Sequence, residues 1–436
     1  LPLMKIPSRI IAPVLLAAVC AGLLMSFLWW QLTQSTLQLS GQQFVDTDLL
    51  GTPVQTISDI PIDSGDASLM HLRQGDILAL RGEWSEAQTQ YEKAVKSGGG
   101  LSALRKLAQS QLQRRDTKGI RSTLKQLKNA GARPEDVLLL EVIIQLRSGE
   151  LVDAKKVLES AEDSPQKHYG LALLAIIQGS HERAIQELSL TINGWDPVLR
   201  SYARTLSAAY DEFALFPSGT DIHLITLISR ALAQVQECEL ALPLLIQVTT
   251  SKEDYRDAWV VQGYCELTTE RPEQALASLE QAYSLDPQKP EIQYFLARSY
   301  AALHEYQNAI TFFEYALTNG FVPQGEVRRL IARYALEIGN AGLALDQYDA
   351  LTNDPNATFE RYQGYVSAAA ALGQADAALA KAKLATEKWP DNARSFELLG
   401  TVAAQLEKKA EAKAAFEKAL EMNPSLPGVK EKLLAL

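Results

Sequence analysis

Apolar residues along most of this chain are spaced three and four positions apart, which is the pattern of amphipathic helices. In the C-terminal part the pattern also recurs as a larger unit. Ala275 and Leu279 are followed 34 residues later by Ala309 and Phe313, and a small residue followed by a large apolar one returns at Ala412. Recurrence at such a period indicates a repeat architecture.

Each unit predicts two antiparallel helices joined by a short turn, such as residues 269–271 or 407–409. Small residues at fixed positions let the two helices approach closely, while Leu and aromatic residues fill the space between them. One unit cannot bury its own apolar face, so each must pack against its neighbours. The pattern therefore predicts a stacked helical solenoid.

The residues at fixed positions of the unit resemble those of the tetratricopeptide repeat family. The resemblance implies an all-α fold, a right-handed α-α superhelical solenoid of helix pairs. The residues that carry it are Trp259, Gly263, Ala275, Leu279, Ala282 and Pro287 in one unit, and Phe396, Leu399, Gly400, Ala412, Phe416, Ala419 and Pro424 in the unit at 393–426.

The spacing predicts clear repeats over residues 256–426 and weaker, partly shortened repeats over 67–196. Residues 197–255 do not give two clean units: a long helix from Pro197 to about Phe213 precedes a helix pair centred on Ser229 and Ala241. This segment is either a joint between two blocks, a place where an insertion projects, or a divergent unit. Residues 427–436 are predicted to form a capping helix over the last apolar face.

Residues 10–30 form an uncharged apolar run that would span about 31 Å as a helix, close to the thickness of a bilayer core. Lys5 and Arg9 precede the run, and no Lys or Arg follows before Arg73, so the positive-inside rule places residues 1–9 in the cytoplasm. We therefore expect one N-terminal transmembrane helix in the inner (cytoplasmic) membrane, with the solenoid in the periplasm or outside the cell. The reversed orientation would place every partner in the cytoplasm.

Two other interpretations of the apolar run stay open. A cleaved signal peptide could be cut near residues 17–22, although the apolar run continues past that point. A lipoprotein site at Cys20 is less favoured, because Val19 stands where such signals have Gly, Ala or Ser.

Residues 31–66 are rich in Gln, Thr, Ser, Gly and Asp and hold no Lys or Arg, which predicts an acidic flexible linker. The alternative is a strand-like segment, residues 44–62, that docks on the solenoid or on a partner.

The net charge of -10 and a pI near 5.2 disfavour a nucleic-acid partner, because phosphate binding needs a clustered basic surface. Three cysteines exclude a disulfide-rich class. Cys238 and Cys265 either pair or remain buried free thiols.

No reactive constellation stands out in the sequence. The five histidines lack metal-ligand spacing, the glycines at 98–100 lack the Lys-Ser/Thr of a phosphate loop, and no nucleophile motif occurs. We therefore expect no enzyme activity, no metal and no cofactor.

In the resembled family the first helix of each unit lines a concave groove that binds a partner. The aromatic and Arg members of that groove are the strongest candidates, because such side chains dominate binding hot spots. Carried onto this chain, the groove positions include Asp257, Tyr264, Glu291, Tyr294, Arg298, Arg328, Gln363, Arg394 and Glu397. The Lys and Asn clamp that some members use for a C-terminal carboxylate is absent at these positions.

Together these features favour a membrane-anchored interaction scaffold that holds protein partners near the membrane during cell-envelope assembly, of the secretion, pilus, polysaccharide-export or cytochrome-maturation type. It would be a bacterial protein that binds no nucleic acid, and it could form homo- or hetero-oligomers. The alternative is a translocon-associated chaperone that binds many exported clients.

Overall fold

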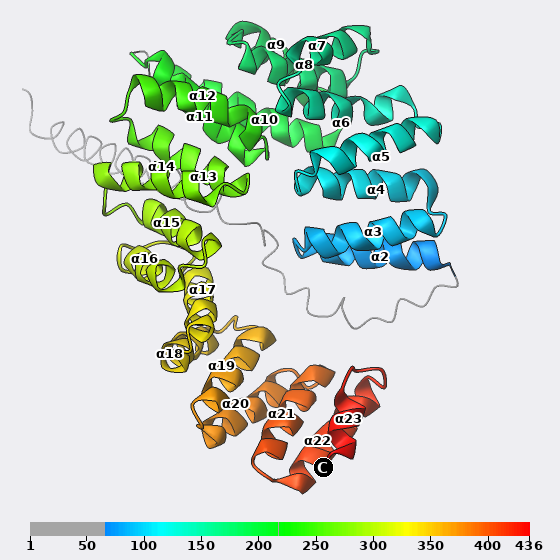
Figure 1. Cartoon of the computed structure of the whole chain (residues 1–436), viewed down its shortest axis with the longest axis vertical. Helices are drawn as coiled ribbons and strands as arrows, with labels where there is room; N and C mark the ends of the chain where they lie inside the picture. Colours follow the sequence, from blue (N-terminus) through cyan, green and yellow to red (C-terminus); the bar gives the residue numbers. More distant parts are fainter. Residues whose placement is uncertain (1–65, 217) are drawn as a thin grey trace, which may run out of the picture. The chain divides into compact units, whose positions relative to one another are not determined.

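A computed structural model describes residues 66–216 and 218–436, and all regular structure within them is helical, with no strand. Consecutive helices form antiparallel pairs that stack on one another along the chain (Figure 1). The pairs are α2 (Ala67–Leu80) with α3 (Trp84–Lys96), α4 (Gly100–Gln113) with α5 (Thr117–Asn129), α6 (Pro134–Arg147) with α7 (Leu151–Ser160), α8 (Pro165–Ile177) with α9 (His181–Ile192), α11 (Asp221–Gln234) with α12 (Cys238–Ser251), α13 (Arg256–Thr268) with α14 (Pro272–Leu285), α15 (Pro290–Ala302) with α16 (Tyr306–Thr318), α17 (Gln324–Glu337) with α18 (Ala341–Thr352), α19 (Phe359–Ala371) with α20 (Ala375–Lys388), and α21 (Ala393–Gln405) with α22 (Lys409–Met422). Two further helices, α10 (Pro197–Ala214) and α23 (Val429–Leu434), stand outside these pairs.

The expected membrane anchor at 10–30, and the linker except for its last residue, lie outside the described residues. Among the helices that the structure does describe, none combines the length and the apolar character needed to cross a bilayer.

Helix boundaries follow from capping residues in the sequence. Asp66 caps α2, because its Oδ1 accepts a hydrogen bond from the Ser68 amide at 2.9 Å. Asp196 caps α10 in the same way, and Pro197 then occupies the first helical position, where its missing N–H costs nothing. Gly179, at a φ of 69°, ends α8 in the left-handed region that favours glycine.

The repeat's small residues lie where paired helices touch. Ala275, Ala309 and Ala412 are fully buried, each in the second helix of a pair. Gly263 on α13 leaves room for Leu279 on α14: a Cβ at this glycine would lie 2.4 Å from the Leu279 Cγ. The two helices can therefore approach closely because residue 263 has no side chain.

Gly263→Ala is accordingly expected to lower the free energy of unfolding by about 1–3 kcal/mol through overpacking. Gly342→Ala in α18 is the matched control. The atom nearest to its added Cβ would be Asn340 Oδ1 at 3.7 Å, and the better helix propensity of alanine should stabilise the chain by about 0.5–1 kcal/mol. Urea unfolding of both variants checks the prediction, which is wrong if the two substitutions change stability in the same direction.

The segment that departs from the repeat spacing contains the unpaired helix α10, which has 18 residues. This helix packs on α9 on one side and on α11 on the other. Its buried residues Leu199, Ala203 and Leu206 belong to one apolar core that continues from α6 to α13. Residues 197–214 are thus an integral layer of the stack.

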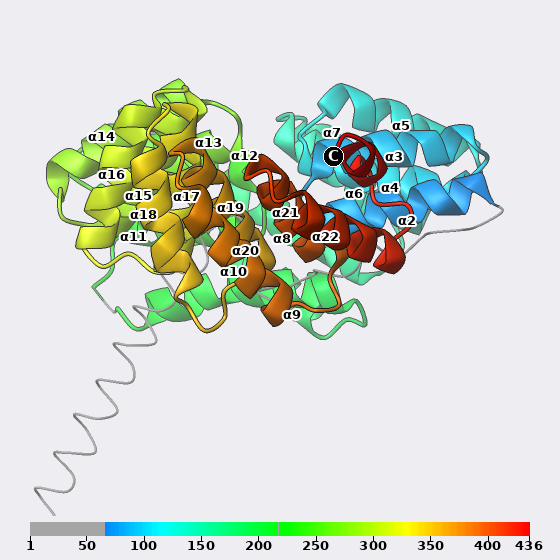
Figure 2. The same cartoon turned by 90° about the horizontal axis from the view of Figure 1, so that it is seen from below.

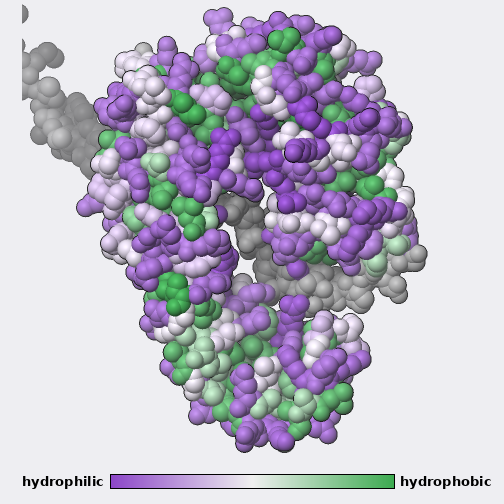
Figure 3. Space-filling view, viewed as in Figure 1, coloured by the Kyte–Doolittle hydropathy of each residue, from purple (hydrophilic) through white to green (hydrophobic). Residues whose placement is uncertain are grey.

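At the C-terminal end, α23 packs on α22 beyond the pairs α19–α20 and α21–α22 (Figure 1). Figure 2 shows α19, α20, α21 and α22 following one another toward the C-terminus. Lys432 of α23 forms an ion pair with Glu397 of α21 at 2.7 Å. The surface that Figure 3 shows is mainly polar, with apolar side chains in small separate groups. On this face the helices thus present mostly solvated polar side chains.

Candidate functional site

The predicted groove residues lie on the first helices of successive C-terminal pairs: Asp257 and Tyr264 on α13, Glu291, Tyr294 and Arg298 on α15, Arg328 on α17, Gln363 on α19, and Arg394 and Glu397 on α21. One series of helices therefore carries all nine. Their exposure differs strongly. Asp257, Gln363 and Arg394 are exposed, whereas Tyr294 is fully buried.

Tyr294 lies in the core, contrary to its expected place on a binding surface. Its ring stacks on Phe321 at a centroid distance of 4.3 Å and meets Phe313 edge-on at 5.7 Å. Phe321 belongs to the loop after α16, so the loop that leads to the next unit covers this position of α15. Tyr294 therefore positions neighbouring helices, and a partner cannot reach its ring without a rearrangement.

Tyr264 is partly buried and meets Phe295 edge-on at 5.4 Å. Arg298 donates a hydrogen bond from Nη1 to the Tyr294 hydroxyl at 3.1 Å, and its guanidinium lies 5.9 Å from the Tyr294 ring centroid. These contacts fix the orientation of the Arg298 side chain above the aromatic core. It is partly exposed and can present its charge at the surface of α15.

The three acidic groove residues each have a cation of the chain beside them. Asp257 pairs with Arg256 at 2.7 Å, and Glu291 lies 3.5 Å from the Lys289 ammonium. Glu397 is engaged by Lys432 of the capping helix. Arg328 instead donates to a neutral group, the Gln347 side-chain oxygen on α18, at 2.9 Å. This surface is therefore of mixed charge, and each acidic position has a basic neighbour.

The structure also contains a buried polar cluster on α12, α13 and α14 that the sequence did not predict. Glu266 accepts hydrogen bonds from the Gln262 amide at 3.0 Å and from the Ser278 hydroxyl at 2.6 Å. Thr249 donates to the Gln262 oxygen at 2.9 Å. All four side chains are buried. Gln262 and Glu266 are one helical turn apart on α13, and this spacing is the only sequence signal for the cluster.

Burial raises the pKa of Glu266, and the hydrogen bonds from Ser278 and Gln262 only partly offset this effect. Since the folded-state pKa lies above the unfolded-state value, the stability that Glu266 contributes is full below the unfolded pKa and is lost as the pH rises through the folded pKa. Glu266→Gln removes the charge and keeps an acceptor oxygen. We expect a higher midpoint of thermal unfolding than wild type at about pH 8 and a smaller difference at about pH 4.

Far-ultraviolet circular dichroism at both pH values measures this difference. The matched control is Glu253→Gln, an exposed residue in the loop between α12 and α13. A midpoint for Glu266→Gln below that of wild type at the higher pH would contradict the prediction.

The described residues hold no group of three or more His, Cys, Asp or Glu side chains arranged to bind a metal ion. Cys238 and Cys265 are free and buried. Burial, and after it the neighbouring Cys238 thiol, raises the pKa of the Cys265 thiol. That thiol is therefore a poor nucleophile in the folded chain.

Three stretches match family models for the tetratricopeptide repeat: residues 226–290, 266–334 and 393–426. Together with the stacked antiparallel pairs, these matches show that the chain carries tetratricopeptide repeats in an all-α solenoid. Proteins built from such repeats mediate protein–protein interactions, which makes a scaffold role plausible.

Among solved structures, the chain is similar to YrrB, a tetratricopeptide repeat protein with an unusual peptide-binding site, at 20% identity and a TM-score of 0.39, over 44% of this chain and 98% of that one. It is also similar to a tetratricopeptide repeat protein from Parabacteroides merdae, at 16% identity and a TM-score of 0.34, over 60% and 98%. A third match is the Cut9–Hcn1 hetero-tetramer of the APC/C, at 14% identity and a TM-score of 0.28, over 88% and 98%. No curated protein matches the chain.

Proposed function

We propose that this chain is a membrane-anchored scaffold that binds partner proteins outside the cytoplasm during cell-envelope assembly, and that it acts by binding and not by catalysis. The observation that carries the binding role is the run of tetratricopeptide first helices α13 to α21, which presents the exposed side chains Asp257, Gln363 and Arg394 along one series. The anchor and the envelope location rest on the apolar run at 10–30 and on the Lys and Arg residues before it.

The binding surface can be tested by in-cell photocrosslinking. Gln363 on α19 is a suitable position because its side chain is exposed on a first helix, in contrast to the buried Tyr294. Glu421, with a side chain 71% exposed, is the control position on a second helix, α22. We expect one or two envelope proteins to be captured from Gln363 and none from Glu421.

The outcomes separate the scaffold from its rival. A broad set of unrelated exported proteins at Gln363 would instead identify a chaperone for exported clients. Equal capture from both positions would mean that the first helices are not the working surface, and the proposed binding role would fail.

The topology has its own test, which needs no partner. A membrane-impermeant maleimide should label a cysteine introduced at Ser58 in cells with a permeabilised outer membrane and should not label one at Ser8. Protection of the Ser58 position together with labelling of the Ser8 position would reverse the orientation and place the partners in the cytoplasm.

A further inference from the structure

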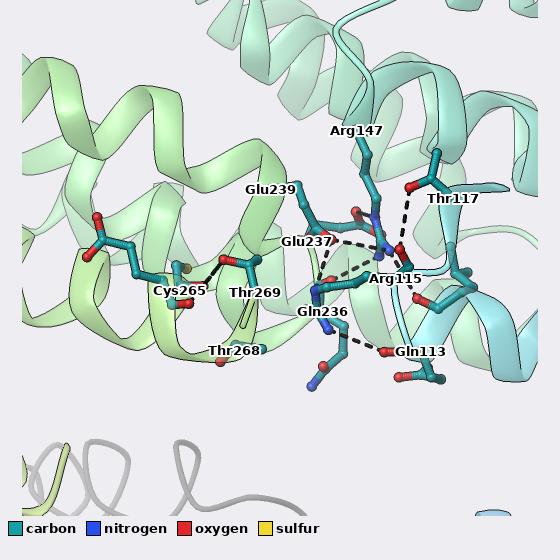
Figure 4. A network of polar contacts seen from close by, with 12 residues as sticks. Gln113, Arg115, Thr117, Arg147, Gln236, Glu237, Glu239, Cys265, Thr268 and Thr269 are labelled. Atoms are coloured by element: carbon teal, nitrogen blue, oxygen red, sulfur yellow. Dashed lines mark hydrogen bonds and ion pairs between the residues drawn. The ribbon is translucent and has the colours of Figure 1, made fainter. Parts of the chain in front are cut away.

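Two parts of the chain that are about 90 residues apart in sequence meet through a buried polar network. The Arg147 guanidinium at the end of α6 donates to both carboxylate oxygens of Glu237, from Nε at 2.8 Å and from Nη2 at 3.1 Å. Nη2 also donates to the main-chain oxygen of Gln236 at 3.0 Å, and Nη1 donates to the main-chain oxygen of Leu112 at 3.3 Å. Figure 4 shows Arg147 reaching down from its helix into this cluster. One side chain thus joins α4, α6 and the turn before α12.

A second ion pair reinforces the first. Arg115, in the turn between α4 and α5, lies 2.9 Å from a Glu239 oxygen, and the same oxygen lies 3.7 Å from Arg147. The side chains are shielded from solvent, with Glu237 only 4% and Arg147 only 13% exposed. Burial raises the pKa of Glu237, while the attraction to Arg147 favours its charged form. A bidentate pair in a dry environment holds its geometry tightly.

The Glu237 charge also acts on two tyrosines of the neighbouring helices α8 and α10. Burial, and after it the Glu237 charge, raises the pKa of Tyr169 on α8 and of Tyr202 on α10. The turn between α11 and α12 is thus held on α6 by Arg147, and its Val235 shares one apolar core with Tyr169 of α8 and Leu206 of α10. In α8, nine of the thirteen residues are buried, so this helix is covered nearly all round.

The backbone of the turn is shaped for this contact. Gln236 adopts a left-handed φ of 68°, which is uncommon for a residue with a side chain and aims its main-chain oxygen at Arg147. Gln236 and Glu237 lie directly before Cys238, the first residue of α12. The turn therefore offers the Gln236 main-chain oxygen and the Glu237 carboxylate to the Arg147 guanidinium. A bound peptide segment could offer the same two acceptors.

We propose that the N-terminal repeats hold the α11–α12 turn as an internal ligand, and that this latch, formed by Arg115, Arg147, Glu237 and Glu239, covers the adjoining surface of the first helices α6 and α8 and of the unpaired helix α10. The open part of the array is then the series from α13 to α21. This consequence for partner binding rests on the proposed function, whereas the latch itself does not.

Distance measurements between two spin labels on the full-length chain test the latch directly. The labels are carried by ketone-bearing unnatural amino acids at Lys118 on α5 and Gln247 on α12, both exposed, so that native thiols stay unmodified. Wild type should give one narrow distance distribution. Arg147→Glu sets a third carboxylate against Glu237 and Glu239, and it should shift the distribution to longer and broader distances.

The matched control is Arg121→Glu, because Arg121 pairs with Glu150 at 2.7 Å between adjacent layers and outside the latch. It should leave the distribution as in wild type. If Arg147→Glu loses its helical circular dichroism signal, Arg115→Glu is used instead. This substitution reverses the charge in the more accessible pair only, and it should shift the distance distribution in the same way. An unchanged distribution in the folded latch variant, or an equal shift in Arg121→Glu, would overturn the proposal. No partner takes part in this experiment, so its result does not depend on whether the proposed function is correct.

Discussion

Phe313→Ala should lower the free energy of unfolding by about 3–5 kcal/mol, because it removes a fully buried ring and leaves a cavity that helix pairs cannot close by collapse. The Phe313 ring meets Tyr294 edge-on at 5.7 Å and stacks with Tyr334 at 6.2 Å, so it connects α15, α16 and α17. Loss of the ring should therefore weaken the packing of two successive helix pairs. Chemical unfolding followed by far-ultraviolet circular dichroism measures the change.

The adjacent residue provides the control for this prediction. Phe312 is only partly buried, and its ring stacks on that of Tyr300 at a centroid distance of 5.4 Å. Phe312→Ala should therefore cost clearly less than Phe313→Ala. Similar losses from the two substitutions would show that the aromatic cluster around Tyr294 is not the core of these repeats.

Arg147→Met should be about as damaging as Phe313→Ala, at about 3–5 kcal/mol, because it leaves the Glu237 carboxylate buried without its counter-charge. Replacing both residues, Arg147→Met with Glu237→Met, removes the uncompensated charge. The double variant should therefore lose less stability than the sum of the two single variants.

A double-mutant cycle by urea unfolding gives the coupling between these two side chains. Lys413→Met and Glu417→Met, from an exposed pair one helical turn apart on α22, form the control cycle. That cycle should give a coupling of only about 0.3–0.5 kcal/mol. Additive losses at Arg147 and Glu237 would mean that the buried pair does not act as a unit.

The sequence was sufficient to predict the repeats because their signals are local and periodic. Ala275 with Leu279 and Ala412 with Phe416 stand at the same spacing, and the structure buries all four in second helices. Both free cysteines of the described residues are also buried, one of the two interpretations that the sequence left open. The anchor and linker predictions fall on residues outside the description and stay predictions.

Two features could not be predicted, and the reason is the same for both. Glu237 looks like an ordinary acidic turn residue, because nothing near it in the sequence points to Arg147, 90 residues away. Tyr294 occupies a groove position by its place in the unit, but Phe321 from the following loop stacks on its ring. In each case the environment is set by a segment from another layer, which periodicity within one unit does not describe.

The single helix α10 has a consequence for chain direction. Neighbouring helices in the stack run antiparallel, so an even number of helices returns the chain to its starting direction and an odd number reverses it. Because α10 stands alone between α9 and α11, we expect the first helices α11 to α21 to run opposite in direction to the first helices α2 to α8. The amino ends of the two sets, with their partial positive charge, would then lie on opposite sides of the helix layers. An extended polypeptide that lies across both sets would meet helix dipoles that point one way before α10 and the opposite way after it.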